Sequence, residues 1–442
     1  MEPVKSEPGE EEPPPRRFSV HSLRTARSND FELAARVESI RGDEPEVEHP
    51  PREGSFSQLS SSSVSELEAV LTRQESRAGD APENEVTYDP IPKYRRVGSF
   101  SDQLVLYLMF TFFGMAGSLV RIGLERLTSF PGSSYGGVLW ANFTGCMIMG
   151  YCVRSSRLFG PLLDGSARRM TRSYTGIGEI PLYVGLTTGF CGSITSFSSF
   201  VSQLFEVSTR QPSYLTDQLE SFPNPGYGVM TWLSYTTVSC GVCMAGFLLG
   251  RHFARAVDKS HQLGTIAAHH ERLLEYTLCT IGVAGYITCI VLTVVEPSWR
   301  YWTFSLLFSP WGVFCRFWVS RYLNPLSGRF MVGTFTVNFI AVIILSIMVL
   351  LQYGTTQKKN GVGEEGDRLI TTVLQCQVVA AIQDGFCGCL STVSTLINEL
   401  HSFKRFRFAY VYGLTSTFLS FSVMVLILGS FSWTHRLDAS LC

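Results

Sequence analysis

The sequence lacks the side-chain patterns on which most enzymes depend. No nucleophile beside a base, no phosphate-binding glycine loop and no cluster of metal ligands is recognisable in it. The twelve cysteines are scattered, without paired CxxC motifs or even spacing, so neither a zinc site nor a disulfide framework is expected. We therefore do not expect an enzyme.

The chain also lacks a strong net charge and an early apolar segment. Its formal charge of −1 averages an acidic first part and a basic remainder, and the sequence gives no sign of a nucleic-acid partner. No cleavable signal peptide is visible, because the first apolar stretch begins only near residue 100. Residues 1–100 are rich in Pro, Ser, Glu and Arg and have no sustained apolar period, which predicts a disordered tail.

Beyond residue 100 the chain is a series of apolar stretches. A hydrocarbon core of about 30 Å needs about 20 helical residues. Nine stretches have that length: 103–124, 135–153, 180–205, 229–250, 273–295, 302–320, 330–351, 370–397 and 408–430. Lys and Arg gather in every second loop, which predicts a cytoplasmic N-terminus and an extracellular C-terminus. We expect an all-α, multi-pass protein of the lipid bilayer.

One polar stretch occurs twice at membrane depth, as residues 189–200 and again as residues 385–396. Both copies, here called the first and second cassette, begin Gly-Phe-Cys-Gly and carry hydroxyl residues at the same later offsets. Helix-breaking polar stretches inside a membrane line pathways or bind ions. In each copy an Asn, Asn142 or Asn338, precedes the opening glycine by 47 positions. Spans one to four therefore repeat as spans six to nine.

The repeat predicts the organisation of the chain. One span separates the two units, so the second is expected to be inverted relative to the first, with a pathway at their shared interface. The predicted parts are a cytoplasmic tail (1–100), a first repeat (101–255), a linker transmembrane helix (273–295), a second, inverted repeat (300–430) and a short C-terminal tail (431–442).

The repeated polar positions are mostly neutral hydrogen-bond donors. Span four of each unit carries a stripe at i, i+4 and i+8, made of Tyr235, Ser239 and Cys243 or of Tyr412, Ser416 and Ser420. Neutral donors suit a small, strongly hydrated anion, and aromatic ring edges can also face one. Taken singly, such residues are more typical of helix packing, and Arg121 and Arg316 of span ends that snorkel to the interface. Because these residues recur in register in both units, we favour a role in an ion pathway over these alternatives.

The cassettes resemble the Gly-Phe-Cys-Gly-Gly-x-Thr-Thr-Phe-Ser-Thr-Phe signature of the CrcB/Fluc fluoride channels. The fused layout is similar to that of the eukaryotic fluoride exporters of this family. The resemblance implies a fluoride-selective channel of the plasma membrane that exports fluoride down its electrochemical gradient and acts as a monomer with an internal pseudo-dimer. A proton-coupled fluoride or small-anion transporter is the alternative, and a membrane scaffold that transports nothing is a more distant one.

The resemblance also implies roles for individual residues. An ion pathway is implied for Asn142, Phe197, Phe200, Tyr235, Ser239, Asn338, Ser394, Thr395, Tyr412, Ser416 and Ser420. A pore-mouth or structural role is implied for Arg121, Arg316 and Glu399. A structural sodium ion is implied on the backbone carbonyls of Gly192, Thr195, Gly388 and Ser391.

The two units depart from the family pattern in complementary ways. The second cassette has Val393 and Leu396 where the family has two phenylalanines. The first unit has Cys243 in its stripe, and Gln203 where the second unit has Glu399. We therefore expect one competent and one impaired pathway. The competent one is expected to contain Asn338 and Tyr412, with aromatic residues supplied by the first unit.

Overall fold

The computed structural model describes residues 100–128, 135, 137–155, 159, 177–209, 223–257, 270–358 and 367–442. The predicted disordered tail lies almost wholly outside these residues. The chain divides into two units at residue 82, and all the described residues belong to the second. Their secondary structure is helical apart from two short strands, as the sequence predicts.

The first repeat contains three long helices and one interrupted one. The long helices are α3 (Phe100–Thr128), α4 (Val138–Arg154) and α9 (Gly226–Val257). The interrupted helix consists of η1 (Ile177–Glu179), α6 (Pro181–Val184), η2 (Gly185–Cys191), α7 (Gly192–Ile194) and α8 (Phe197–Thr209). Helices α4 and α9 pack closely because Gly150 and Gly250 each lie against the backbone of the other helix.

The linker helix α11 (Glu271–Val295) is followed by η3 (Pro297–Trp299) and by the second repeat. That repeat begins with α12 (Arg300–Leu323), η4 (Asn324–Leu326) and α13 (Val332–Tyr353). Its interrupted helix consists of α14 (Val373–Ala381), η5 (Ile382–Cys387), α15 (Gly388–Leu390) and α16 (Ser394–Ser402). The last helical segments are α17 (Phe406–Met424), η6 (Val425–Gly429) and α18 (Ser430–Thr434).

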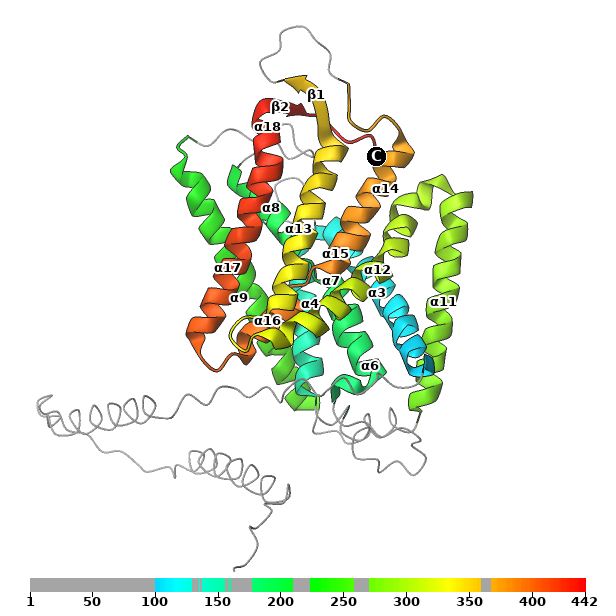
Figure 1. Ribbon diagram of the computed structural model, residues 1–442. Coiled ribbons are helices and arrows are strands. Elements are labelled where there is room, and N and C mark those ends of the chain that lie inside the picture. Colours follow the sequence, from blue (N-terminus) through cyan, green and yellow to red (C-terminus); the bar gives the residue numbers. More distant parts are fainter. Residues whose placement is uncertain are drawn as a thin grey trace, which may run out of the picture. The chain divides into compact units, whose positions relative to one another are not determined.

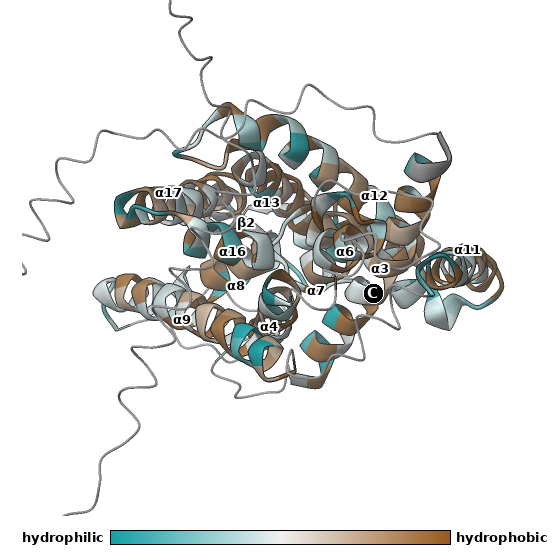
Figure 2. Cartoon of the chain, turned by 90° about the horizontal axis from the view of Figure 1, so that it is seen from below, coloured by the Kyte–Doolittle hydropathy of each residue, from teal (hydrophilic) through white to brown (hydrophobic). Residues whose placement is uncertain are grey.

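Six of the described helices are long and apolar enough to cross a membrane. They correspond to predicted spans one, four, five, seven, eight and nine. The remaining three are less regular: α4 has 17 residues, the first interrupted helix is divided at Thr195, and α12 carries three arginines. The helix α11 lies at the rim of the bundle with most of its surface uncovered, as suits a lipid-facing linker (Figures 1 and 2).

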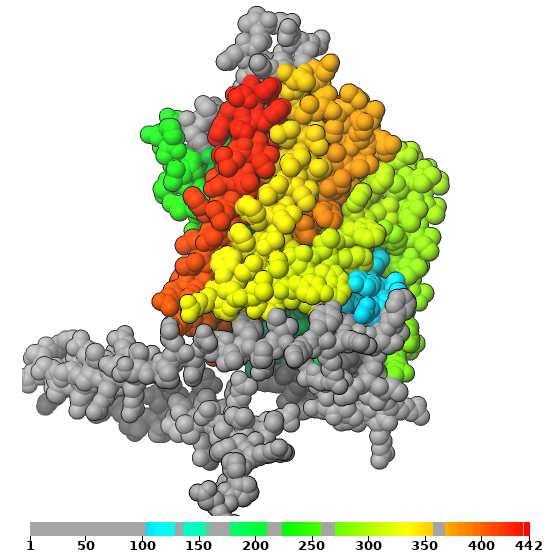
Figure 3. Space-filling model, in the orientation of Figure 1, coloured from blue at the N-terminus to red at the C-terminus, as the bar shows by residue number. Residues whose placement is uncertain are grey.

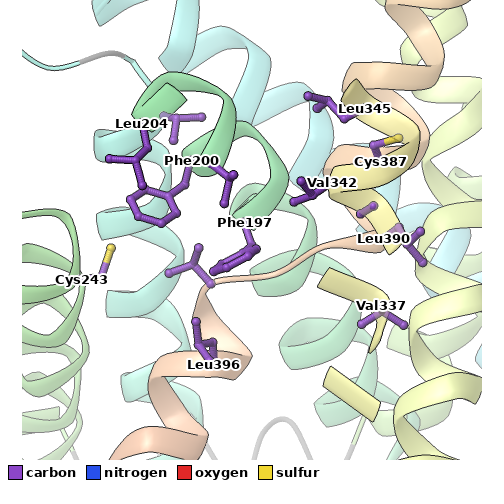
Figure 4. Packing of buried hydrophobic residues seen from close by; sticks show 14 of the residues in the cluster. Phe197, Phe200, Leu204, Cys243, Val337, Val342, Leu345, Cys387, Leu390 and Leu396 are labelled. Carbon is purple, nitrogen blue, oxygen red and sulfur yellow. The ribbon is translucent and has the colours of Figure 1, made fainter. Parts of the chain in front are cut away.

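The interruptions of the two broken helices meet inside the bundle. The short segments α7 and α15 pack against each other, and both contact helices of the opposite repeat (Figure 1). A large apolar cluster surrounds them and draws on both repeats; it includes Phe197, Phe200, Val337, Val342 and Leu396. Figure 4 shows Phe197 beside the extended stretch that joins α15 to α16.

The sequence did not predict the structure at the end of the bundle where the chain finishes. Strand β1 (Gly354–Lys358) pairs antiparallel with β2 (His435–Leu437), and Cys376 forms a disulfide with Cys442. The expectation of no disulfide is therefore wrong for this pair. Its two cysteines are 66 residues apart and share no spacing motif, so the sequence carries no signal for them. Helices α13, α14 and α17 form one continuous face below this end (Figure 3).

Candidate functional site

Each cassette contains a short extended break between two helical segments. Segment α7 ends at Ile194, Thr195 has extended dihedrals (φ −98°, ψ 140°), and α8 begins at Phe197. In the second cassette, Ser391 is extended in the same way (φ −88°, ψ 158°) between α15 and α16. A π-helical stretch, η2 or η5, precedes each break. Backbone groups are left without helical partners here, so each needs another partner in the membrane.

The two asparagines supply some of those partners. Asn142 accepts a hydrogen bond from the backbone N–H of Ser196 (2.8 Å) and donates to its carbonyl (3.4 Å). Asn338 does the same with Thr392, at 2.8 and 3.2 Å. Both side chains are buried. Each asparagine therefore clamps the break of its own repeat, and its place beside an ion stays a prediction.

Hydroxyl groups then connect the two breaks. The Oγ1 of Thr195 accepts from the backbone N–H of Ser394 (3.2 Å), and the Oγ of Ser391 accepts from that of Ser198 (3.0 Å). A side-chain oxygen at a helix start is the usual N-cap. Here each cap comes from the opposite repeat, so neither α8 nor α16 has a complete N-terminus without the other half. Thr395 lies one residue further on and donates its N–H to Thr392.

Two buried arginines also cross between the repeats. The Nε of Arg121 donates to the carbonyl of Ser193 (3.1 Å), and its Nη2 donates to the carbonyl of Asp384 in η5, directly before the second cassette. Arg316 donates through Nη1 to the carbonyls of Gly192 (2.6 Å) and Ser391 (3.1 Å). Their exposed fractions are 0% and 2%. The alternative interpretation, in which each arginine snorkels to the interface, does not hold for either one, because their guanidinium groups donate to buried carbonyls at and near the breaks. A place at a pore mouth stays a prediction.

The arginine contacts explain why each cassette carries a fourth-place glycine. Arg316 lies directly against Gly192, and Arg121 lies in the same way against Gly388. A Cβ atom at either glycine would overlap a guanidinium group. The glycine is therefore required here by close approach rather than by backbone conformation.

Only Arg121 has a carboxylate partner. Its Nη1 lies 3.6 Å from Oε1 of Glu125, one helical turn further along α3. Nearby, Tyr301 donates to the carboxylate of Asp384 (2.8 Å), and Arg126 lies 4.0 Å above the ring of Tyr301. Arg316 makes no ion pair with a carboxylate in the part of the chain that the structure describes. The sequence predictions included none of these three residues. The i+4 spacing from Arg121 could have pointed to Glu125, but no spacing connects Asp384 or Tyr301 with Arg121.

Backbone oxygens are the ligands available to a metal ion at the breaks. No group of three or more His, Cys, Asp or Glu side chains that could hold a metal occurs among the described residues. Of the four carbonyls predicted to hold sodium, those of Gly192 and Ser391 already accept from Arg316. A sodium ion on these oxygens would share them with a guanidinium group, and the sodium site stays a prediction.

Beside the second break, a buried carboxylate organises the polar stripe of α17. Glu399 accepts hydrogen bonds from Tyr412 (2.7 Å), Thr334 (2.6 Å) and Asn324 (3.3 Å), and is 8% exposed. The matching position in the first repeat is Gln203, which accepts from Tyr235 (2.8 Å). The sequence predictions did not include Thr334 or Asn324. The position that matches Thr334 in the first repeat is Val138, so the repeat gave no signal for it.

The stripes also contain hydroxyl groups without a partner. The hydroxyls of Ser239 on α9 and Ser420 on α17 are buried and make no hydrogen bond to any described residue. Within the described part of the chain, the hydroxyl of Ser416 donates to the carbonyl of Tyr412, in its own helix. Buried polar groups are normally satisfied. Unpaired donors on both stripes are therefore available to a small anion or to water.

The aromatic pair comes from the first cassette alone. Phe197 and Phe200 are buried with ring centroids 5.8 Å apart, and Phe200 stacks on Tyr235 at 6.1 Å. Their helix α8 packs on α13 and α17 of the second repeat, which carry Asn338 and Tyr412. Helix α16 packs in the corresponding way on α4 and α9, and presents Leu396 instead of an aromatic ring (Figure 4).

Known proteins with similar sequences fit this arrangement. The model of the family described as "CrcB-like protein, Camphor Resistance (CrcB)" matches residues 108–251 and again residues 303–430. Fluoride export protein 1 of Candida albicans is 37% identical over 73% of this chain and 78% of its own length. Proteins of the same printed name are 31% identical in Neurospora crassa (80% of this chain, 71% of theirs) and 30% identical in Schizosaccharomyces pombe (74% and 96%).

No solved structure matches this chain. The family model, however, covers more than half of it in two separate segments, and those segments contain both cassettes, both asparagines and both arginines. The chain belongs to the CrcB-like family, with two copies of the family's unit fused in one polypeptide.

Proposed function

We propose that the protein is a fluoride channel that exports fluoride from the cytosol and makes the cell resistant to it. The observation that carries the proposal is the pair of interlocked breaks, flanked by stripes with unpaired neutral donors, in a chain whose relatives are named fluoride export proteins. Neutral donors can replace part of the hydration shell of a small anion without holding it as tightly as a full charge would.

The electrochemical gradient is sufficient to drive this export. Hydrogen fluoride enters cells uncharged and ionises in the more alkaline cytosol. A negative-inside potential then favours exit of the anion by about 2.3 kcal/mol per 100 mV. No coupling ion is required, so a passive channel suffices.

The proposal includes nine membrane spans in the plasma membrane, with the N-terminus in the cytosol and the C-terminus outside. The domain boundaries are those stated above: a tail to residue 100, repeats at 101–255 and 300–430, a linker helix at 273–295 and a C-terminal tail from 431. An inverted second repeat is supported by the exchanged contacts at the breaks. Arg121 and Arg316 reach across in matching ways, and so do Thr195 and Ser391. A single chain then acts as a complete pseudo-dimer.

One of the two pathways is proposed to conduct. It runs beside Asn338, Ser394, Thr395 and the stripe of Tyr412, Ser416 and Ser420, with Phe197 and Phe200 contributed by α8. The packing of α8 on α13 and α17 supports this assignment; α8 also packs on α9, where Phe200 stacks on Tyr235. The other pathway, with Asn142, Tyr235 and Ser239, has Leu396 and Val393 in place of rings and is proposed to be impaired.

A sodium ion on the carbonyls of Gly192, Thr195, Gly388 and Ser391 is part of the proposal, since oxygen ligands suit a hard cation. Its role would be structural. Replacing sodium by N-methylglucamine should lower the thermal unfolding temperature of the purified protein, with potassium as a control. An unchanged unfolding temperature would remove sodium from the proposal.

Reconstituted liposomes provide the main test. Fluoride efflux should follow an imposed potassium-diffusion potential and should be the same with and without a pH gradient. In cells that lack their own exporter, the full chain should restore growth on fluoride. If a folded, surface-located protein gave neither efflux nor growth, the proposal would fail, and a scaffold that transports nothing would take its place.

A proton-coupled fluoride transporter is the second candidate, and Glu399 is the observation that favours it. This carboxylate is buried within a network of three donors next to the proposed pathway. The same liposomes distinguish the candidates, because coupled transport would move protons with fluoride and would continue at zero potential under a pH gradient. Glu399→Gln should abolish that coupling but leave potential-driven efflux in a channel.

A further inference from the structure

The C-terminal strap, residues 435–442, is fixed to the bundle at three places. Its strand β2 pairs with β1, the N–H of Asp438 donates to the carbonyl of Tyr353 (2.8 Å), and Cys442 is bonded to Cys376. Cys376 is fully buried in the first turns of α14, the helix that leads into the second cassette. Figure 1 shows the strap at the end of the bundle where β1 and α14 also lie.

A chain of glutamines continues from the strap toward the second cassette. Gln352, at the end of α13, donates to the hydroxyl of Ser440 in the strap (3.2 Å). Gln383, in η5, donates in turn to the side-chain oxygen of Gln352 (2.6 Å). The next residue is Asp384, whose carbonyl accepts from Arg121. The strap is therefore connected to the buried arginine of the first repeat through three contacts.

The first repeat lacks the cysteine that anchors this strap. The position that matches Cys376 in the first repeat is Ile180, because matching cassette residues are 196 positions apart throughout (189 and 385, 142 and 338). In an inverted pair these two positions face opposite sides of the membrane. A disulfide is stable on the oxidising outer side and is rare on the cytosolic side. The cysteine at position 376 would thus face the oxidising outer side, and the isoleucine at position 180 would face the cytosol.

We propose that the strap is an extracellular, disulfide-locked brace that holds the outer half of the second broken helix in place. The Cys376–Cys442 bond would form during secretion by exchange with a protein disulfide. In this chain two S–H bonds break and one S–S bond forms. Two electrons and two protons pass to the partner disulfide, whose S–S bond breaks to give a dithiol. This proposal rests on the extracellular C-terminus that is part of the proposed function. It does not depend on whether the transported ion is fluoride.

The side of the membrane is tested on intact cells that express the full chain. A membrane-impermeant phosphine reductant is applied, and free thiols are then labelled with an impermeant maleimide. Peptide mass spectrometry should find the 376–442 cross-link before reduction and maleimide on Cys442 after it. Labelling that requires permeabilised cells, or thiols that are free before reduction, would overturn the proposal.

The brace itself is tested by Cys376→Ser with Cys442→Ser. Cys315→Ser is the control, because Cys315 is a free, exposed cysteine of the same repeat. Loss of a cross-link that closes 66 residues should lower the unfolding temperature by roughly 5 to 10 °C, and the control should lie within about 1 °C of the natural chain. If the double variant fails to fold, the same shift is measured on the natural chain before and after reduction.

Equal unfolding temperatures with and without the bond would contradict the proposal that the strap acts as a brace. Fluoride efflux is recorded in parallel and should fall about two- to fivefold without the bond, in line with a loosened broken helix. If the natural chain carries no fluoride at all, the proposed function fails, while the labelling and unfolding results still decide the brace.

Discussion

Arg121 and Arg316 occupy matching places in the two repeats, and each donates to a carbonyl of the opposite repeat's interrupted helix. Their surroundings differ. Arg121 has Glu125 at 3.6 Å, with Asp384 and Tyr301 beyond it, whereas Arg316 donates to three carbonyl oxygens and has no carboxylate partner among the described residues. Both repeats therefore keep the hydrogen bonds from a buried arginine to backbone carbonyls. They differ in the charged side chains that lie near that arginine. Duplication leaves each half free to lose what the other retains.

Removing either arginine is expected to have the largest effect on stability. Arg316→Met leaves three carbonyls without donors, at about 1 to 3 kcal/mol for each unsatisfied group. Arg121→Met also leaves Glu125 without its cation. Adding Glu125→Gln should therefore recover part of the loss in Arg121→Met but none in Arg316→Met. Thermal unfolding of the four variants measures this, and equal recovery in both backgrounds would show that the two sites do not differ in charge.

Gly388→Ala and Gly192→Ala should come next, because each added Cβ overlaps a guanidinium group. We expect the yield of folded protein and the fluoride efflux to fall at least about tenfold, as for other overpacked cores. Gly241→Ala is the matched control, since nothing lies within 4 Å of its added Cβ. It should be neutral or more stable by about 1 kcal/mol. Normal efflux from both cassette variants would refute the close approach described here.

The aromatic difference can be tested by copying the second cassette into the first. Phe197→Val with Phe200→Leu reproduces Val393 and Leu396, and should lower fluoride efflux per folded molecule by about tenfold if ring edges stabilise the anion by roughly 1.4 kcal/mol. Leu396→Met, a change of similar volume in the other cassette, serves as control and should leave efflux within about twofold. Unchanged efflux in the double variant would show that the rings only pack.

The smallest expected difference concerns the two tyrosines. Tyr412→Phe removes a donor to the carboxylate of Glu399, and Tyr235→Phe removes one to the neutral amide of Gln203. Hydrogen bonds to charged groups contribute about 1.5 to 3 kcal/mol, and neutral ones about 1. Tyr412→Phe should therefore lower the unfolding temperature more. Equal effects would indicate that Glu399 is protonated, so that both bonds are neutral. A larger effect of Tyr235→Phe would contradict the prediction.

Much of the helical layout could be predicted from the sequence. Apolar runs of about 20 residues determine where helices lie, and the repeated Gly-Phe-Cys-Gly start located both breaks. The matching asparagines and stripes followed from residue spacing, which a single chain displays directly.

The contacts between the repeats could not be predicted in the same way. The pairing of Arg316 with Gly192, and of Thr195 with Ser394, joins residues more than a hundred positions apart. Such contacts depend on how the breaks cross in space. Glu399 is an example. The family resemblance pointed to this residue, but its hydrogen bonds to Thr334 and Tyr412 depend on how α16 lies beside the other helices of the second repeat.

The central claim is that fluoride passes beside Asn338 rather than beside Asn142. Both side chains clamp a break through the same two bonds, so Asn338→Asp and Asn142→Asp should disturb the fold equally. An added carboxylate repels an anion only where the anion passes, by roughly 3 kcal/mol at 5 Å. Efflux from liposomes should therefore fall at least about tenfold in Asn338→Asp and stay near the natural value in Asn142→Asp. Efflux that survived in Asn338→Asp and collapsed in Asn142→Asp would contradict the account.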